Sequence, residues 1–317
     1  MKKFFITGAA GFIGSHVCEH ILTKFPNSKI IALDKLTYAG NKLFLKEIIN
    51  NKNFTFIKSD ILETKKYVKY LKKIDCAINI AAESHVDNSF ANSIEFTKTN
   101  TLGAHIFLEN CIKNQIKKII HISTDEVYGD KLRGKSYEKD SLNPTNPYSA
   151  SKAAAEMITG SYKYIFKKDI VIIRANNIYG IRQFPEKLIP SCIFSLINNR
   201  KIQIHGNGLN RRHFLSVGDF CNALEIIIRK VNGGIYNIGS DESFQNIQIA
   251  KKICALMKKS NKSIKYTKDR PFNDKRYSVS SKKIQNLGWK PKKNLFKELN
   301  EIIKWYSKNY KIFSKNI

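Results

Sequence analysis

The chain has 317 residues, of which 42% are hydrophobic and 11% aromatic, a composition typical of a water-soluble globular protein. It is long enough for one large domain or for two moderate units that share an interface. No apolar run reaches the ~20 residues of a membrane-spanning helix, so we expect no membrane partner.

The formal net charge of +29 raises the question of a polyanionic partner. The basic residues are 46 Lys but only 9 Arg, and they are dispersed over the whole length. This pattern is typical of an AT-rich coding sequence, and the aromatic and Gly-rich platforms of RNA-binding proteins are missing. We therefore expect a solvated basic surface and no nucleic-acid partner.

The N-terminus and the cysteines indicate the compartment. Met1–Ile6 briefly resembles a signal peptide, but Thr7–Gly11 interrupts it and no convincing cleavage region follows. The six cysteines lack a C-x-x-C pair and mostly adjoin apolar residues; they stand at positions 18, 76, 111, 192, 221 and 254. We predict buried reduced thiols and a cytoplasmic protein.

The first half alternates short β-rich runs with longer helical patterns, which predicts parallel βαβ units. Strands are expected at Lys3–Thr7, Lys29–Leu33, Phe54–Ile57, Cys76–Ile80, Lys118–Ile122 and Ile170–Arg174. Helices are expected at Ile13–Phe25, Ile94–Lys113 and Ser149–Phe166. The predicted fold is α/β, with a doubly wound Rossmann-type parallel sheet whose ligand lies beyond the carboxyl ends of the strands.

After about Tyr179 the elements become shorter, because Pro185, Pro190 and several glycines interrupt them. We expect residues 1–178 to form the cofactor-binding domain and residues 179–317 a smaller mixed lobe that binds the substrate. A segment near 214–240, including a helix at Asp219–Lys230, is expected to return to the sheet.

A glycine pattern joins the first strand to the first helix, with Gly8, Gly11 and Gly14 in a G-x-x-G-x-x-G spacing. Such glycines allow a tight turn and let backbone N–H groups approach a pyrophosphate at the helix N-terminus. Asp34 ends the second strand, where a carboxylate accepts from both ribose hydroxyls and repels a 2′-phosphate. The expected cofactor is therefore NAD rather than NADP, and no metal ion is expected.

Two further positions follow strands three and four. Asp60 is a candidate for the adenine edge, although a helix N-cap explains it equally well. Ala81 and Ala82 place small side chains where a cofactor needs close backbone approach.

Tyr148 and Lys152 lie one helical turn apart on one face of a predicted helix. The Lys charge, joined by a positive nicotinamide, is expected to lower the pKa of Tyr148 and make it a base. The same Y-x-x-x-K spacing at Tyr38 and at Tyr164 indicates only surface residues. Tyr148 differs from these because it follows the unusual Ser123–Gly129 segment.

In that segment Thr124, Asp125 and Glu126 follow the fifth strand directly. Two adjacent acids at a turn are usually solvated or cap a helix. Beside a redox Tyr/Lys pair they supply an acid to protonate a leaving hydroxyl and a base to remove a proton, as a dehydration requires.

These motifs resemble the extended short-chain dehydrogenases, and specifically the nucleotide-glucose 4,6-dehydratases, over nearly the whole chain. The matching runs are Asp34–Gly40, Ala81–Asp87, Ser123–Gly129, Tyr148–Lys152 and Gln183–Pro190. Plain epimerases are similar at the glycine loop and the Tyr/Lys pair but lack the Asp-Glu insertion after Thr124.

The resemblance implies a closed redox cycle. Tyr148, oriented by Lys152 and Thr124, takes the C4 hydroxyl proton while hydride passes to NAD+. Glu126 then removes the C5 proton and Asp125 protonates the leaving C6 hydroxyl. Hydride returns to C6, which gives a 4-keto-6-deoxy sugar and regenerates NAD.

The resemblance also assigns the binding residues. The expected cofactor contacts are Gly8, Gly11, Phe12, Ile13, Gly14, Asp34, Lys35, Thr37, Asp60, Ile61, Ala81, Ala82, Glu83, Thr99, Tyr148, Lys152 and Asn177. The expected substrate contacts are Ser84, Thr124, Asn177, Glu186, Lys187, Leu188, Arg212, Asn273 and Arg276.

The expected nucleotide is UDP-glucose, with dTDP-glucose as the alternative. Phe272 and Asn273 replace a Gly and a His of bacterial dTDP-glucose enzymes, and residues 213–216 also depart from them. Val86–Phe90 and Arg270–Asp274 are similar to plant rhamnose synthases and to viral UDP-glucose 4,6-dehydratases.

Two other functions and a homodimer are also to be considered. A C4-epimerase or decarboxylase would need no acid for C6 dehydration. A silent NAD-binding or RNA-binding protein would lack the catalytic groups, whereas all five are present. Helices Ile94–Lys113 and Ser149–Phe166 could form a homodimer seam, although core packing explains their apolar residues equally well.

Overall fold

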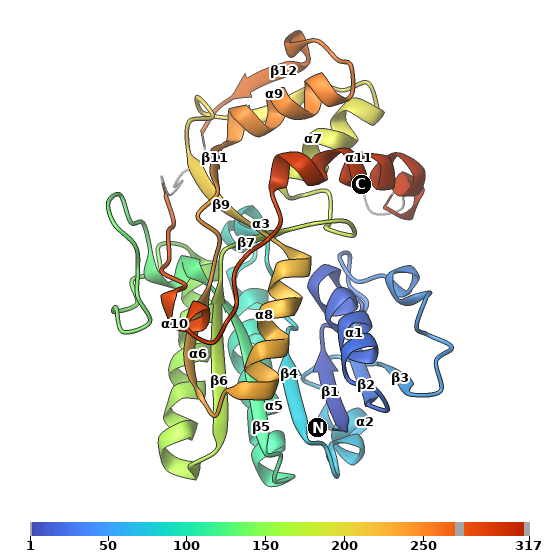
Figure 1. Cartoon of the computed structure of the whole chain (residues 1–317), viewed down its shortest axis with the longest axis vertical. Helices are drawn as coiled ribbons and strands as arrows, with labels where there is room; N and C mark the ends of the chain where they lie inside the picture. Colours follow the sequence, from blue (N-terminus) through green and yellow to red (C-terminus); the bar gives the residue numbers. More distant parts are fainter. Residues whose placement is uncertain (1, 270–275, 314–317) are drawn as a thin grey trace.

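The computed structural model describes residues 2–269 and 276–313 (Figure 1). Its largest element is a seven-stranded sheet in the order β10-β6-β5-β4-β1-β2-β3, in which every neighbouring pair is parallel. The strands are β1 (Lys3–Thr7), β2 (Lys29–Asp34), β3 (Phe54–Lys58), β4 (Cys76–Asn79), β5 (Lys118–Thr124), β6 (Asp169–Ala175) and β10 (Gly234–Ile238). The predicted doubly wound α/β fold is confirmed.

Helices cover both faces of this sheet because its strands bury side chains on both sides. Phe4 and Ile6 of β1 belong to the core under α1 and α8, whereas Phe5 points to the opposite core with Phe107 and Leu108. The main helices are α1 (Phe12–Lys24), α5 (Ala104–Lys113), α6 (Pro147–Phe166) and α8 (Val217–Lys230). Shorter helices are α2 (Thr64–Tyr67), α3 (Val86–Ala91) and α10 (Lys282–Gln285).

The predicted helix at Ile94–Lys113 is helical throughout, but its middle part is not α-helical. It consists of α4 (Ser93–Phe96), a π-helical segment η3 (Thr97–Gly103) and α5. Within η3, Asn100 exchanges hydrogen bonds with the Glu83 backbone and donates to Ser151 Oγ over 2.9 Å. π-helical turns are frequent at functional sites.

A smaller lobe stands over the carboxyl ends of the large sheet (Figure 1). Its three-stranded sheet has the order β11-β9-β7, and β8 pairs with β12. Its elements are β7 (Asn177–Tyr179), α7 (Leu188–Ile197), β8 (Ile202–His205), β9 (Arg211–Ser216), β11 (Ser243–Gln245), α9 (Asn246–Leu256), β12 (Ile264–Thr267) and α11 (Leu295–Asn309). The lobe has its own core, in which Tyr179, Ile193 and Tyr306 are buried.

The segment after β9 returns to the large sheet. Helix α8 packs against α1, and β10 pairs with β6 from Gly234 to Ile238. Strand β10 was not predicted, because Gly233 and Gly234 indicated a turn; both have positive φ angles, and the strand begins at the second of them.

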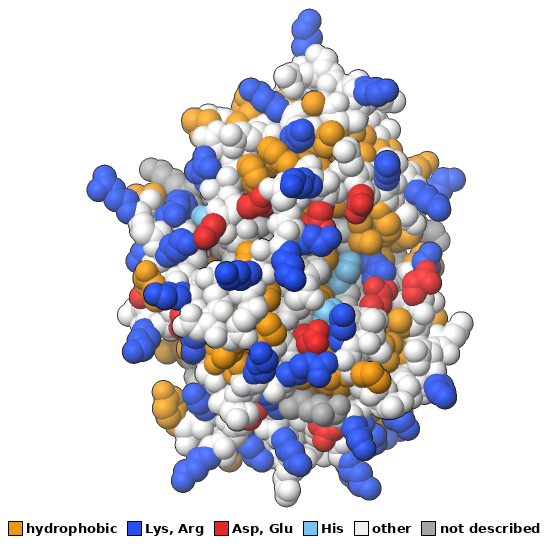
Figure 2. Space-filling model, viewed as in Figure 1, with side chains coloured by type: hydrophobic (Ala, Val, Ile, Leu, Met, Phe, Trp, Pro, Cys, Tyr) orange, Lys and Arg blue, Asp and Glu red, His pale blue; other side chains and the backbone are white. Residues whose placement is uncertain are grey.

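The spread of basic side chains over the surface and the burial of the cysteines agree with the expectations from the sequence. Figure 2 shows Lys and Arg side chains scattered over the visible face rather than gathered in one patch. All six cysteines lie in the described ranges and are buried and unpaired. In the part of the chain that the structure describes, no helix is both long and apolar enough to cross a membrane.

Candidate functional site

A cavity of about 280 Å³ opens at the carboxyl ends of the central strands. Every residue predicted to contact the cofactor lines it, from the glycine loop to Asn177. The predicted catalytic residues line the same cavity: Thr124, Asp125, Glu126, Tyr148 and Lys152. The fold thus brings together predicted residues from eight separate segments of the chain.

The glycine loop leaves no room for side chains. Gly8 has φ +67°, and a Cβ there would lie 2.7 Å from Ala81 N. A Cβ at Gly14 would lie 2.0 Å from the carbonyl oxygen of Gly8. The backbone of Ile80 and Ala81, which faces the glycine loop, is held by Thr7, because Thr7 Oγ1 accepts hydrogen bonds from Ile80 N and Ala81 N. The loop is therefore a backbone cradle at the start of α1, suited to a pyrophosphate.

Asp34 lies at the end of β2 and is only 8% exposed. Its carboxylate accepts from Ala10 N over 2.9 Å and from Leu36 N over 2.7 Å. Burial raises its pKa, while these backbone bonds oppose the rise. Each oxygen keeps a lone pair for a further donor, so the position fits a ribose diol.

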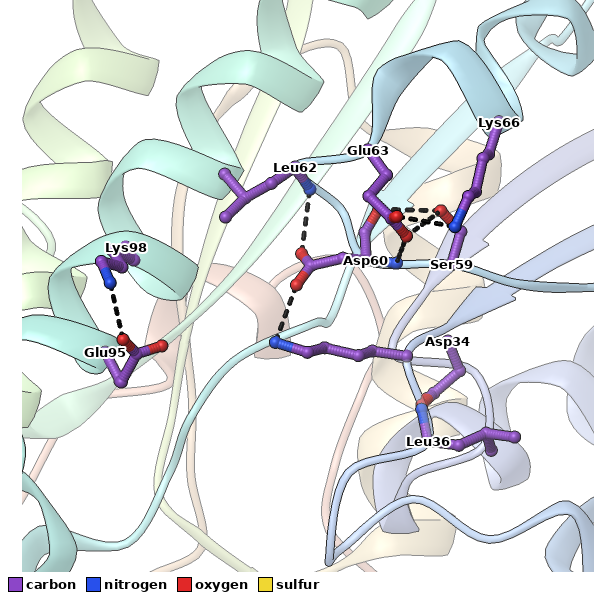
Figure 3. Close-up of polar contacts among 10 residues, drawn as sticks. Asp34, Leu36, Ser59, Asp60, Leu62, Glu63, Lys66, Glu95 and Lys98 are labelled. Atoms are coloured by element: carbon purple, nitrogen blue, oxygen red, sulfur yellow. Dashed lines mark hydrogen bonds and ion pairs between the residues drawn. The ribbon is translucent and has the colours of Figure 1, made fainter.

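Asp60 makes both a local and a long-range contact (Figure 3). Its Oδ1 accepts from Leu62 N over 3.0 Å in the turn before α2, and its Oδ2 pairs with Lys35 Nζ at 2.7 Å. The local bond resembles the capping role that was the alternative for Asp60. The ion pair closes one end of the cavity beside Asp34.

Asp125 and Glu126 begin the short helix η4 (Asp125–Tyr128) directly after β5. Thr124 caps this helix: its Oγ1 accepts from Glu126 N over 3.2 Å and lies 3.3 Å from Asp125 Oδ1. Asp125 is 2% exposed, and Asn176 Nδ2 donates to its Oδ2 over 2.6 Å. Burial, followed by the charge of Glu126, raises the pKa of Asp125 to about 7. This carboxyl can therefore carry a proton near neutral pH.

Tyr148 and Lys152 lie in the first turns of α6, which begins at an Asn146–Ser149 capping box. Lys152 Nζ donates to the carbonyl oxygen of Ile122 over 2.6 Å, and burial lowers its pKa to about 8. Burial and the Glu126 charge raise the pKa of Tyr148 above its usual range, although a hydrogen-bonding interaction with Thr124 lowers it. The expectation that Lys152 and a positive nicotinamide together lower the pKa of Tyr148 stays a prediction, because burial dominates in the protein without the cofactor.

A second cavity, of about 250 Å³, adjoins the first toward the lobe. Glu126, Asn177, Glu186 and Lys187 line both cavities, which makes them one continuous site. Asn177 Nδ2 is buried and has no hydrogen-bond partner within the described ranges, so it is a donor available to a ligand between them.

The predicted substrate residues divide between the cavities. Ser84 and Thr124 line the first, and Leu188 and Arg212 line the second. Arg276 is not among the lining residues of either; its guanidinium donates to the carbonyl oxygens of Lys131 and Gly134. Phe272 and Asn273 lie outside the described residues.

Several lining residues were not predicted. They are polar groups of both cavities: His85, Asp87, Asn176, Gln203, His205 and Asn246. Asn176 could have been found from its place after the sixth strand, since strand ends point into the crevice. Gln203 and His205 carry no such indication, because β8 reaches the site only through the folding of the lobe.

Comparison with known proteins agrees with this geometry. The family model described as GDP-mannose 4,6 dehydratase matches residues 5–302. A dTDP-D-glucose 4,6-dehydratase of Dictyostelium discoideum is 42% identical, over 98% of this chain and 82% of that protein. An Arabidopsis thaliana trifunctional protein, named for UDP-glucose 4,6-dehydratase, 3,5-epimerase and reductase activities, is 40% identical over 97% of this chain. The chain spans about half of that plant protein, 47% of its length.

A solved structure extends the comparison to three dimensions. The dTDP-glucose 4,6-dehydratase DesIV of Streptomyces venezuelae, solved with NAD bound, superposes with a TM-score of 0.96 at 32% identity. The match covers 99% of this chain and 100% of that one.

Proposed function

Because the chain belongs to the GDP-mannose 4,6 dehydratase family, we propose that it is an NAD-dependent dehydratase that converts UDP-glucose to UDP-4-keto-6-deoxyglucose and water. The observation that carries this proposal is the acid pair Asp125–Glu126 in the same cavity as Tyr148. Dehydration needs an acid for the C6 hydroxyl and a base for the C5 proton, which Asp125 and Glu126 can supply, whereas epimerisation at C4 needs neither.

The residues present fit NAD. The glycine cradle receives a pyrophosphate, Asp34 receives a ribose, and the buried Asn177 amide offers an unused donor. When bound, NAD supplies the hydride acceptor for C4 and the hydride donor for C6. Solved relatives with NAD support this assignment.

The chain's own residues supply the proton transfers. Tyr148 acts as the phenolate, which the buried Lys152 charge and the positive charge of bound NAD+ would favour, and it accepts the proton of the C4 hydroxyl. Glu126 removes the C5 proton, which the C4 ketone has made acidic. Asp125 then donates its proton to the C6 hydroxyl, which leaves as water. Glu126 returns its proton to C5 when C6 is reduced, and the proton taken up by Tyr148 restores the acid form of Asp125.

Arg212 and Lys187 are positioned to hold the anionic nucleotide. Both line the second cavity, and Lys187 Nζ donates to the carbonyl oxygen of Ser84 over 2.5 Å. These cations lie on the lobe side of the acid pair, so the sugar would reach the first cavity while its diphosphate stays in the second.

We assign UDP-glucose as the substrate because the Val86–Phe90 segment resembles the corresponding segment of UDP-glucose 4,6-dehydratases. The alternative, dTDP-glucose, is supported by the Dictyostelium relative, whose 42% identity is similar to that of the plant protein. A thymine methyl group alone is worth roughly 1 kcal/mol of discrimination.

Incubating the purified protein with each nucleotide sugar tests the proposal. Mass spectrometry should show loss of one water, and the product should develop the alkaline absorbance of a 4-keto sugar. Epimerisation would leave the mass unchanged and would refute the proposal. A clear kcat/KM preference for dTDP-glucose would overturn the UDP assignment alone.

A further inference from the structure

Asn176 lies where the chain leaves the large sheet, between the end of β6 and the start of β7. It is 3% exposed. Its side chain donates to Asp125 Oδ2 over 2.6 Å, and its backbone N donates to the carbonyl oxygen of Ile238, at the end of β10, over 3.0 Å. Asn176 thus connects the acid after β5 to the neighbouring strand ends.

On the basis of the proposed function, we infer that Asn176 is the positioning residue for Asp125 and determines which carboxyl oxygen carries the transferable proton. An amide N–H can only donate, so Oδ2 must accept. The proton of the neutral acid is therefore confined to Oδ1. In the structure Thr124 Oγ1 donates to Oδ1 over 3.3 Å. Because a hydroxyl group can rotate, it can accept from Oδ1 instead once the carboxyl is protonated, so the proton is held on the Thr124 side of the carboxyl group.

Gly239 keeps the Asn176 amide in this orientation. A Cβ at Gly239 would lie 2.1 Å from Asn176 Oδ1 and 2.9 Å from its Cγ. The Gly239 backbone is itself fixed, because its N donates to Ser281 Oγ over 2.7 Å and its carbonyl oxygen accepts from the same hydroxyl. Gly239 is absent from the lining residues of both cavities. A Cβ there would meet Asn176 first and would also lie 2.8 Å from Val279 Cγ2, so the effect on Asp125 is separated from this packing change by the double variant.

The groups around Asp125 determine in which direction loss of Asn176 should shift the pKa of Asp125. Glu126, on the same short helix, raises the pKa of Asp125, whereas Arg212 of β9 lowers it. Tyr148 of α6 lies across the same cavity. The Asn176 hydrogen bond stabilises the charged carboxylate and also lowers the pKa. Its removal should therefore move the alkaline limb of the activity profile to higher pH.

Three variants test the inference: Asn176→Leu, Gly239→Ala and the double variant. We expect kcat at the pH optimum to fall at least about 10-fold in each, with little change in KM or bound NAD. In Asn176→Leu the alkaline limb of the pH–activity profile should also move to higher pH. The double variant should be no worse than Asn176→Leu, because both changes act through one contact.

Gly160→Ala is the matched control, because a Cβ there meets nothing within 4 Å in the described part of the chain. Unchanged kcat, a loss of kcat without a shift of the alkaline limb, or additive losses in the double variant would overturn the inference. A readout independent of turnover is the Asp125 pKa, measured by carbon-13 NMR in the unmodified protein and in Asn176→Leu. If the unmodified protein forms no 4-keto sugar, the proposed function fails, while an upward NMR shift would still support the contact.

Discussion

At the scale of the residue, removal of the Asp125 carboxyl should stop the reaction at an identifiable point. Asp125→Asn keeps the shape of the side chain but has no carboxyl proton to give the C6 hydroxyl. We expect kcat to fall by about 10²–10⁴ while oxidation at C4 still proceeds. Reduced nicotinamide should accumulate on addition of UDP-glucose, which its absorbance would report. Loss of both steps together would assign Asp125 a different role.

The pH dependence of kcat should report the same carboxyl. Asp125 must be protonated to act as an acid, and burial raises its pKa to about 7. Activity should therefore be lost as the pH rises through about 7. Deprotonation of Lys152, whose pKa burial lowers to about 8, adds to the loss. A profile measured across neutral pH that stays flat would contradict this assignment.

At the scale of elements, the turn between β1 and α1 depends on Gly14. A Cβ at this position would lie 2.0 Å from a backbone oxygen, so Gly14→Ala must move the loop. We expect about 1–3 kcal/mol of destabilisation and a loss of bound NAD. Thermal unfolding and the nucleotide released on denaturation measure the two effects. Gly160→Ala, measured in parallel, should retain the nucleotide.

The C-terminal end of α8 is held by Lys118, a buried lysine of β5. Its ammonium donates to the carbonyl oxygens of Ile227, Ile228 and Val231 and pairs with Asp169 at 3.1 Å. Lys118→Met would leave these groups without their donor, which should cost about 2–4 kcal/mol of stability. Chemical unfolding should detect the loss, whereas the exposed neighbour Lys117 can be changed to Met with an effect under about 0.5 kcal/mol.

The elements also show what a sequence can and cannot predict. Six strands were found because each is a short apolar run between turn residues, and β1 has its predicted bounds. Strand β10 was not predicted because it begins at a pair of glycines, which indicate a turn. The π-helical character of η3 was not predicted because it accompanies side-chain contacts of Asn100 with distant residues. Around the site, the glycine loop and the catalytic residues follow strand ends and were predictable from local order. The walls from β8 and α9 depend on non-local packing, which no local pattern encodes.

At the scale of the whole molecule, the neighbouring helices α4 and α6 carry large apolar side chains that are exposed to solvent. Ile94 is 66% exposed, Met157 70% and Tyr164 83%. They lie on α4 and α6, which pack side by side. We expect two copies to associate through this face, and light scattering should give the mass of a dimer. Met157→Glu should weaken the dimer, whereas Leu132→Glu, 62% exposed in a loop, should not.

The return of α8 and β10 to the large sheet has a consequence for dissection of the protein. A fragment that ends near residue 178 would leave the outer edge of β6 unpaired and the apolar flank of α1 in water. An exposed, Ile-rich edge of this kind invites aggregation. The domain that contains the large sheet is therefore discontinuous in sequence, and a single cut near residue 178 would not release it whole.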